Sequence, residues 1–305
     1  MSKSVAAVVV TYNRKNLLSQ ALQSLLDQTV PLAKIIIVDN ASNDGTFEHI
    51  KQLGLIDHEA IEYFKLETNT GGAGGFRFGL KQAYDLGHEW VWLMDDDVLA
   101  DQNCLEKLLE ITEITQGKYK IIQANRVDMD SNEPFKYTTQ FNFKNPFKLE
   151  TVKEINPNQI SADYHPIVSF PFEGPMIHRE VITNIGEVDD TYFIICDDAD
   201  YAIRANRKGF KAVVARNAIL RRFSLHNNKK QIFDWKDYYM VRNRIELDRR
   251  YGGNYIFVSR TFVQFMKLNI RLLKRINRLR FREYILLLKA FKDGLTNIRG
   301  KTVSP

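Results

Sequence analysis

Three consecutive aspartates, Asp95, Asp96 and Asp97, end the apolar run in the segment WVWLMDDDVLA. Adjacent carboxylates repel one another, and the interior of a sheet cannot hold them unpaired. Carboxylate oxygens are hard ligands that suit Mg²⁺ or Mn²⁺, and such a cation would cancel the repulsion and bridge to a diphosphate. Helix capping or pairing with Lys and Arg is the alternative, but three carboxylates in a row after a buried strand favour a metal site.

A second acidic cluster, Asp197, Asp198 and Asp200, lies in the segment CDDADYAIRA at the expected start of a helix. One of these carboxylates can cap the helix, and Asp200 can pair with Arg204 four residues later. A remaining carboxylate near a metal site can act as a general base on a hydroxyl group. Capping alone stays open as the alternative.

The glycine-rich stretch NTGGAGGF, at residues 69–76, follows one apolar run and precedes a helical pattern. A dinucleotide-binding turn needs G-x-G-x-x-G, which fits in no register here, and the P-loop pattern is absent as well. The glycines still allow close approach of the backbone to a ligand and a helix N-terminus directed at an anion. A tightly packed turn is the alternative.

The elements that must position these side chains alternate between strand and helix. Short apolar runs predict strands at residues 5–12, 34–40, 61–67, 90–96 and 119–125, and helical spacing predicts helices at 14–28, 45–53, 74–87 and 103–114. This alternation predicts an α/β fold with a mostly parallel sheet flanked by helices. Ligands bind such sheets at the carboxyl ends of the strands, so we expect the polar segments after the first four strands to meet there.

The rest of the chain predicts one excursion and one helical region. Residues 126–165 are polar and irregular, which indicates a hairpin or loop rather than a domain. The pattern resumes at residue 168 and includes the strand KAVVA, and after Trp235 it is mainly helical. We therefore expect a catalytic domain at residues 1–234 and a helical region at 235–305.

Composition limits the class of protein. The 305 residues and 44% apolar content suit one large globular domain with an appendage. No apolar run reaches the ~18 residues of a membrane-spanning helix, and the run at residues 5–10 is too short for a signal peptide. Cys104 and Cys196 form no pattern, so the sequence predicts a reduced cytoplasmic protein.

Positive charge is concentrated near the C-terminus. Residues 260–292 contain ten Lys and Arg against the single acid Glu283, a charge of +9, so the rest of the chain carries −3 of the total of +6. The mildly acidic body argues against a nucleic-acid partner. Segment 256–292 mixes these bases with Leu, Ile and Phe, which indicates a helical pair on an anionic membrane surface or a helical cap that packs on the catalytic domain or a partner subunit.

In combination, the motifs resemble those of family 2 of the glycosyltransferases, which has the GT-A fold. The resemblance covers about the first 225 residues and rests on VVVTYNR, IIIVDNASNDGT, NTGGAGGF, WLMDDDV and DDADYAIRANRKGF, which occur in the family's order. NTGGAGGF with WLMDDD and DDADY is most similar to the galactofuranosyltransferase branch. The neighbouring rhamnosyltransferase branch shares much of this, including a stretch like YYMVRN at residues 238–243.

The resemblance implies a role for each motif. Asp198 would be the catalytic base, with Asp197 as the second choice, and Asp95 and Asp97 would bind Mn²⁺ or Mg²⁺. The nucleotide-sugar donor would be bound by Thr11, Asn13, Arg14, Asp39, Asn40, Asn69, Gly71, Gly72, Gly74, Gly75, Asp96 and Glu173. The family also uses a metal-binding His after the following strand.

At that position the sequence departs from the family. The usual spacing falls on Arg222, and His226 lies a few residues later. A lone His is by itself more often structural than a ligand. Either a longer loop brings His226 to the metal, or Arg222 supplies part of the charge neutralisation.

The implied function is inverting, metal-dependent transfer of galactofuranose from UDP-galactofuranose to a hydroxyl of a growing bacterial surface polysaccharide. The acceptor would be lipid-linked, which places the protein on the inner face of the cytoplasmic membrane. A rhamnosyltransferase using dTDP-rhamnose is one alternative. A nucleotidyltransferase is another, although TYNRKN lacks its glycine signature, and a non-catalytic nucleotide-binding protein would not need the carboxylates at 95–97 and 197–198. The oligomeric state is left open.

Overall fold

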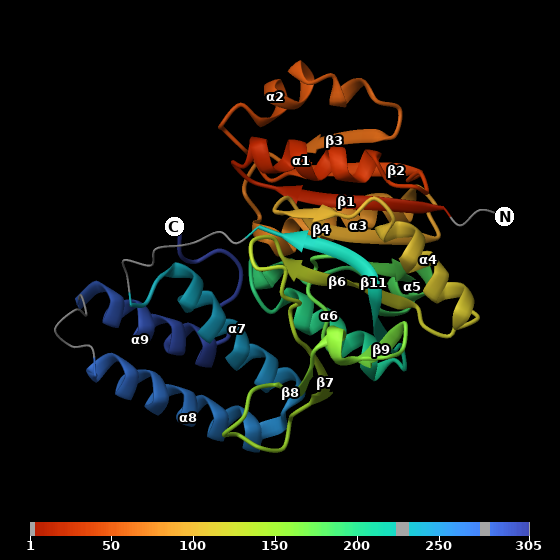
Figure 1. Cartoon of the computed structure of the whole chain (residues 1–305). Helices are drawn as coiled ribbons and strands as arrows, with labels where there is room; N and C mark the ends of the chain where they lie inside the picture. The colour runs from red at the N-terminus through yellow and green to blue at the C-terminus, as the bar shows by residue number, and fades with distance from the viewer. Residues whose placement is uncertain (1–3, 224–231, 275–280, 305) are drawn as a thin grey trace.

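The computed structural model describes residues 4–223, 232–274 and 281–304 (Figure 1). Its first half alternates strands and helices, which confirms the predicted α/β class. The elements are β1 (Val5–Thr11), α1 (Lys15–Leu26), β2 (Lys34–Asp39), α2 (Thr46–Gln52), β3 (Ile61–Lys65), α3 (Gly71–Asp85), β4 (Trp90–Asp95), β5 (Val98–Ala100), α4 (Cys104–Ile114) and β6 (Ile121–Asp128). A short 3₁₀ turn, Leu55–Asp57, precedes β3.

The second half adds strands to the same sheet and then three long helices. Its elements are β7 (Tyr137–Phe141), β8 (Thr151–Ile155), β9 (Tyr164–Ile167), β10 (Pro175–His178), α5 (Arg179–Ile185), α6 (Asp197–Arg207), β11 (Ala212–Arg222), α7 (Trp235–Tyr251), α8 (Gly253–Leu273) and α9 (Phe281–Leu295). β7 and β8 pair as an antiparallel hairpin, which confirms the excursion predicted within residues 126–165.

The main sheet has the order β3-β2-β1-β4-β10-β6-β11-β5, with β9 also paired to β11. β3, β2, β1 and β4 are parallel neighbours, so their carboxyl ends lie at one edge. β10 is inserted antiparallel between β4 and β6. This insertion brings the residues just before Pro175 to the edge where β4 ends.

Both faces of the sheet are covered, which explains the continuous apolar strands. All seven residues of β1 are buried. Val5, Ala7 and Val9 pack into a core with α1 and α4, whereas the alternate residues of β1 pack into the opposite core with α3, α5 and α6. This alternation follows from the two-residue repeat of a strand.

The C-terminal helices form a layer with a core of its own. Figure 1 shows α7, α8 and α9 grouped on one side of the sheet domain. Tyr238, Tyr239 and Leu287 are buried between them, and Phe193 from the sheet domain joins the same core. α7 begins at Trp235 behind a capping box made by Asp234 and Asp237. In the described parts of the chain no helix has both the length and the apolarity to cross a bilayer.

Candidate donor and catalytic site

The three aspartates lie where β4 turns into β5. Asp95 is the last residue of β4, and Asp96 and Asp97 form the turn. Asp96 accepts hydrogen bonds from Thr11 Oγ1 at 2.7 Å and from Arg14 Nη1 at 3.0 Å. The same Arg14 nitrogen lies 3.2 Å from Asp97 Oδ2. Arg14 therefore offsets part of the aspartates' charge within the protein itself.

Negative charge remains in excess around Asp97. Burial raises the pKa of Asp95, and the neighbouring Asp97 and Glu173 raise it further. Burial also raises the pKa of Asp97, with Glu173 adding to the rise and Arg14 opposing it. Asp97 Oδ1 is buried and has no hydrogen-bond partner among the described residues. A divalent cation fits this oxygen chemically, because it would supply the missing positive charge.

The described residues supply only part of a metal's coordination shell. Within residues 4–223, 232–274 and 281–304, no group of three or more His, Cys, Asp or Glu side chains is arranged to hold a metal. Asp95 and Asp97 would therefore need ligands from a bound diphosphate or from His226. His226 lies outside the described residues.

Glu173 connects the aspartate turn with the second acidic cluster. It precedes β10 and sits between two arginines, with Arg126 Nη1 2.5 Å from its Oε2 and Arg222 Nε 3.3 Å from its Oε1. Arg222 also acts against the rise in the pKa of Asp97. Arg222, the residue at the position where the family usually has a metal-binding His, thus pairs with Glu173, next to the aspartates.

The ends of β1 and β2 are joined by hydrogen bonds. Asp39 is fully buried, and its carboxylate accepts from the Ser42 N–H at 2.7 Å and from the Tyr63 hydroxyl. Asn13 adopts φ of 54° and accepts from the Asn43 N–H at 2.8 Å. These contacts fix the loops after both strands, whereas the role of Asp39 in binding the nucleotide-sugar donor stays a prediction.

Asn40 ties the glycine stretch to the end of β2. Its Nδ2 donates to Gly71 O at 2.7 Å, and its Oδ1 accepts from the Thr70 N–H at 2.8 Å. Asn69 Oδ1 accepts from the Gly71 N–H at 2.8 Å. Asn40 and Asn69, two of the three asparagines predicted to bind the donor, therefore hold the glycine-rich loop in place.

The glycines form the first turn of α3, which begins at Gly71, three residues earlier than predicted. Gly71 has φ of +75°, and a Cβ there would lie 1.9 Å from Phe193 O. A Cβ at Gly75 would lie 2.5 Å from Val10 Cγ1, whereas one at Gly72 would meet nothing within 4 Å. At Gly74 the nearest atom would be Thr70 Oγ1, at 2.3 Å. Close packing therefore requires glycine at positions 71, 74 and 75. It does not explain the glycine at position 72, where a side chain would have room.

The second acidic cluster begins α6. Burial, and then the adjacent Asp198, raise the pKa of Asp197 to about 8. Burial, with Glu173 adding to it, raises the pKa of Asp198 to about 6. Asp198 opens into a cleft of about 210 Å³ whose other lining residues are Arg126, Lys136, Tyr137, Thr138, Thr151, Ser169 and Pro171. Its raised pKa and its place in a cleft are the properties expected of a general base.

Asp200 has a different role. It is fully buried and pairs with Arg204 at 2.8 Å, as the i, i+4 spacing predicts. It also accepts from the hydroxyls of Tyr192 and Tyr251. Its carboxylate is therefore saturated by structural contacts, which leaves Asp197 and Asp198 as the reactive candidates.

Sequence reasoning missed two residues of α7 that hold the loop before α6. Asn243 Nδ2 donates to the carbonyls of Tyr192, Ile194 and Ile195 at 3.1, 2.8 and 2.7 Å. Arg242 Nη2 donates to the same Tyr192 carbonyl at 2.9 Å. Both side chains are 2% exposed.

The loop that they hold is strained and touches both halves of the site. Phe193, Ile195 and Cys196 all have positive φ, a conformation that costs non-glycine residues of order 1 kcal/mol each. Phe193 O also accepts from the Ala73 N–H at 3.1 Å. Arg242 and Asn243 therefore stabilise a loop that links the start of α3 to the start of α6. Their only sequence signal was the adjacent Arg-Asn pair in YYMVRN.

Comparison with known proteins identifies relatives of the chain. Residues 6–184 match the family model described as Glycosyl transferase family 2. The galactofuranosyltransferase GlfT1 of Mycobacterium tuberculosis is 30% identical over 215 residues, which are 68% of this chain and 66% of that protein. GlfT1 of Mycolicibacterium smegmatis is 27% identical over 209 residues, 67% of this chain and 66% of that protein. The chain thus spans just under two thirds of the length of these relatives.

Solved structures share the architecture at low identity. A crystal structure of GalNAc-T7 with UDP, GalNAc and Mn²⁺ aligns with a TM-score of 0.66 and 12% identity, over 83% of this chain and 49% of that one. The structure of Staphylococcus aureus TarS 1–349 with UDP aligns with a TM-score of 0.54 and 15% identity, over 80% and 64% of the two chains. The fold is therefore the predicted GT-A fold.

The substitution Asn243→Ala tests the structural role of the α7 clamp. It removes the amide that donates to three carbonyls of the loop, and the free energy of unfolding should fall by about 2–3 kcal/mol because the strained loop loses these hydrogen bonds. Urea unfolding measures the change. Asn184→Ala is the matched control, since exposed Asn184 makes one local bond to Glu180 O. An equal, small effect of both substitutions would contradict the clamp.

Proposed function

The chain belongs to glycosyl transferase family 2, and on that basis we propose that it transfers a sugar from a nucleotide donor to a glycan hydroxyl with inversion. We propose UDP-galactofuranose as the donor and a lipid-linked, growing bacterial surface polysaccharide as the acceptor. The printed names of the relatives support the sugar. The activity of the whole protein is part of the proposal.

One observation carries the assignment of the site. Glu173 pairs with Arg126, which lines the same cleft as Asp198, and its charge also raises the pKa of Asp97 in the aspartate turn. A carboxylate proposed to bind the metal, Asp97, and the carboxylate proposed as the general base, Asp198, are therefore both influenced by Glu173. Glycosyl transfer needs this pairing, since charge on the leaving diphosphate and the proton of the acceptor must be handled at adjacent points.

In the proposed reaction the diphosphate lies beside Arg14 and the aspartate turn. Bound by Asp95 and Asp97, a divalent cation would stabilise the negative charge of the diphosphate. The Asp198 carboxylate takes the proton of the acceptor hydroxyl as that oxygen attacks the anomeric carbon. The bond from the anomeric carbon to the diphosphate breaks at the same time, so the configuration inverts without a covalent enzyme intermediate. Asp197 is the second choice for this base.

We further propose that the C-terminal helices rest on the inner face of the cytoplasmic membrane. Exposed apolar side chains repeat along one face of α8 at Tyr255, Val258, Phe262, Met266 and Ile270. A similar row on α9 comprises Phe281, Ile285 and Leu288. From Phe262 to Leu288 these residues lie within residues 260–292, the segment of charge +9, and apolar burial with basic residues favours an anionic bilayer surface.

The substitution Asp198→Asn tests the base. We expect transfer to fall by about 10²–10⁴-fold while UDP binding, measured by calorimetry, stays close to that of the unchanged protein. Because the pKa of Asp198 is raised to about 6, the wild-type rate should fall as pH drops below 6, where the carboxyl becomes protonated. Asp85→Asn, at an exposed position on α3, is the control. Near-normal transfer by the Asp198 variant would refute the assignment.

A donor screen tests the sugar and the metal together. UDP-galactofuranose, dTDP-rhamnose and UDP-hexopyranoses are offered with Mn²⁺ and with EDTA, and product is measured by mass spectrometry. We expect transfer from UDP-galactofuranose and its loss in EDTA, restored by Mn²⁺. Preference for dTDP-rhamnose would overturn the donor assignment, and full activity in EDTA would overturn the metal assignment.

Flotation with vesicles tests the membrane contact. The protein should rise with vesicles rich in anionic phospholipid and stay behind with purely zwitterionic ones, because each Lys or Arg near an anionic surface contributes about 1 kcal/mol. Phe262→Ser on the exposed face of α8 should reduce flotation. The matched control is Leu53→Ser, which removes an exposed leucine after α2. Equal flotation of the two variants, or none with anionic vesicles, would count against the proposal.

A further inference from the structure

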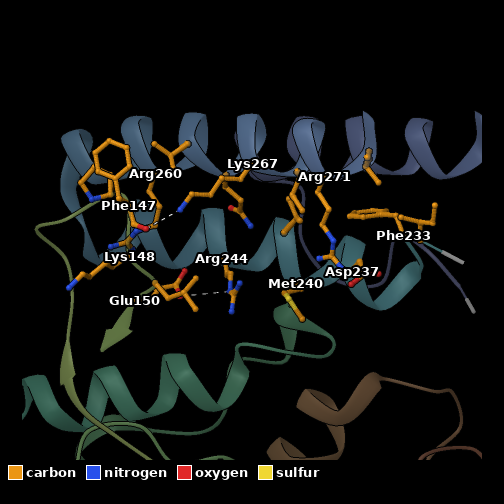
Figure 2. Close-up of a pocket in the computed structure, with 18 residues that line it drawn as sticks. Phe147, Lys148, Glu150, Phe233, Asp237, Met240, Arg244, Arg260, Lys267 and Arg271 are labelled. Carbon is orange, nitrogen blue, oxygen red and sulfur yellow. Dashed lines mark hydrogen bonds and ion pairs between the residues drawn. The ribbon is translucent and has the colours of Figure 1, made fainter. Parts of the chain in front are cut away.

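A groove of about 260 Å³ lies between α7, α8 and the segment at residues 146–150. In Figure 2, Phe147 and Lys148 lie at one end of this groove, and Phe233 and Asp237 lie at the other. The α8 residues that line it face α7, on the side of the helix opposite the exposed row that begins at Tyr255. The groove is therefore distinct from the surface proposed to rest on the membrane.

The walls of the groove are apolar. Val241 of α7, Leu272 of α8 and Phe233 are each 3% exposed and line it, together with Val263 and Leu268. Its volume is near the lower end of the roughly 300–1,000 Å³ typical of small-molecule sites. An apolar concavity of this size suits a hydrocarbon chain better than a sugar or a nucleotide.

The rim is positively charged. Lys148, Lys267 and Arg271 are exposed along it, and in the described chain none of them has a carboxylate within ion-pair distance. Lys267 Nζ donates to Phe147 O at 3.0 Å, which points its charge across the groove (Figure 2). The acidic lining residues are occupied elsewhere, since Glu150 pairs with Arg244 at 3.7 Å and Asp237 belongs to the α7 capping box.

Two buried polar atoms in the wall lack a partner. Glu150 Oε1 and Arg260 Nε have no hydrogen-bond partner within the described residues, and the two side chains belong to residues that are 8% and 4% exposed. Such orphaned atoms cost free energy unless a bound group satisfies them. A hydroxyl group at the polar end of a bound chain can bond to both atoms, whereas an ionised phosphate can accept only from Arg260 Nε.

We propose that this groove binds the hydrocarbon chain of a single-chain anionic amphiphile drawn from the membrane, with its charged head at the end formed by Lys148 and Lys267. The apolar walls favour a hydrocarbon chain, and the basic rim favours a negatively charged head group. A second copy of the chain is a poorer occupant, because it would bring another basic rim against the first.

The groove also adjoins the catalytic cleft. Glu150 lines the groove, and the next residue, Thr151, lines the cleft that contains Asp198. Glu150 and Arg244 both affect the pKa of Cys196, which directly precedes α6. An amphiphile in the groove would therefore have its head close to the segment that carries the proposed base. Binding itself requires no transfer chemistry, so it can be tested apart from the proposed function.

Calorimetry on the full chain with monomeric dodecyl phosphate tests the inference. We expect saturable binding of one molecule per chain, no comparable binding of inorganic phosphate, and weaker binding of dodecyltrimethylammonium. Val263→Trp should abolish binding by filling the groove. Lys148→Glu, at an exposed position, should weaken binding by at least about fivefold, the equivalent of about 1 kcal/mol for a basic residue near an anion.

Two matched variants control for general effects. Val258→Trp adds the same bulk on the exposed face of α8, and Lys144→Glu reverses an exposed charge outside the groove. Both should bind dodecyl phosphate as the unchanged protein does. Absent or unsaturable binding, equal binding by Val263→Trp and Val258→Trp, or a concentration-dependent dimer that Val263→Trp abolishes without any amphiphile binding would each overturn the inference.

Discussion

Mutual repulsion among buried carboxylates is the constraint on which the rest of this structure depends. Asp97 and Glu173 raise the pKa of Asp95, and Glu173 raises the pKa of Asp97, because burial removes the water that would screen these charges. Arginines from three different strands or loops neutralise part of this charge. Arg14 binds the aspartate turn, and Arg126 and Arg222 bind Glu173. The neutralisation is incomplete, since Asp97 Oδ1 has no partner in the described chain. A site of this kind is suited to a ligand that brings positive charge together with a diphosphate.

The fold brings these groups together by strand order rather than by sequence proximity. Four parallel strands place the loops after β1, β2 and β4 at one edge, and the antiparallel β10 delivers Glu173 to the same edge. The strained turn before α6 delivers Asp197 and Asp198. Arg242 and Asn243 of α7 hold that turn, so the C-terminal helices contribute to the geometry of the site as well as to a separate groove.

Much of this was predictable from sequence, and the exceptions have physical causes. Buried parallel strands are continuous β-branched runs, so β1 and β2 were predicted within one or two residues, and the polar residues at their ends identified the site edge. β10 is only four residues long and its position between β4 and β6 is set by tertiary pairing, which no local pattern encodes. The contribution of Asn243 depends on carbonyls about fifty residues away. The start of α3 was predicted too late, because glycine has low helix propensity and the packing of Gly71 and Gly75 is visible only in three dimensions.

The aspartate turn and Arg14 form the proposed diphosphate and metal part of the site. A crystal structure of the full chain with UDP and Mn²⁺ tests it most directly. The account predicts Mn²⁺ bound to oxygens of both Asp95 and Asp97 and to the diphosphate, with Asp97 Oδ1 no longer without a partner. Well-ordered UDP bound away from this turn, or Mn²⁺ held by other residues with Asp95 and Asp97 untouched, would contradict it.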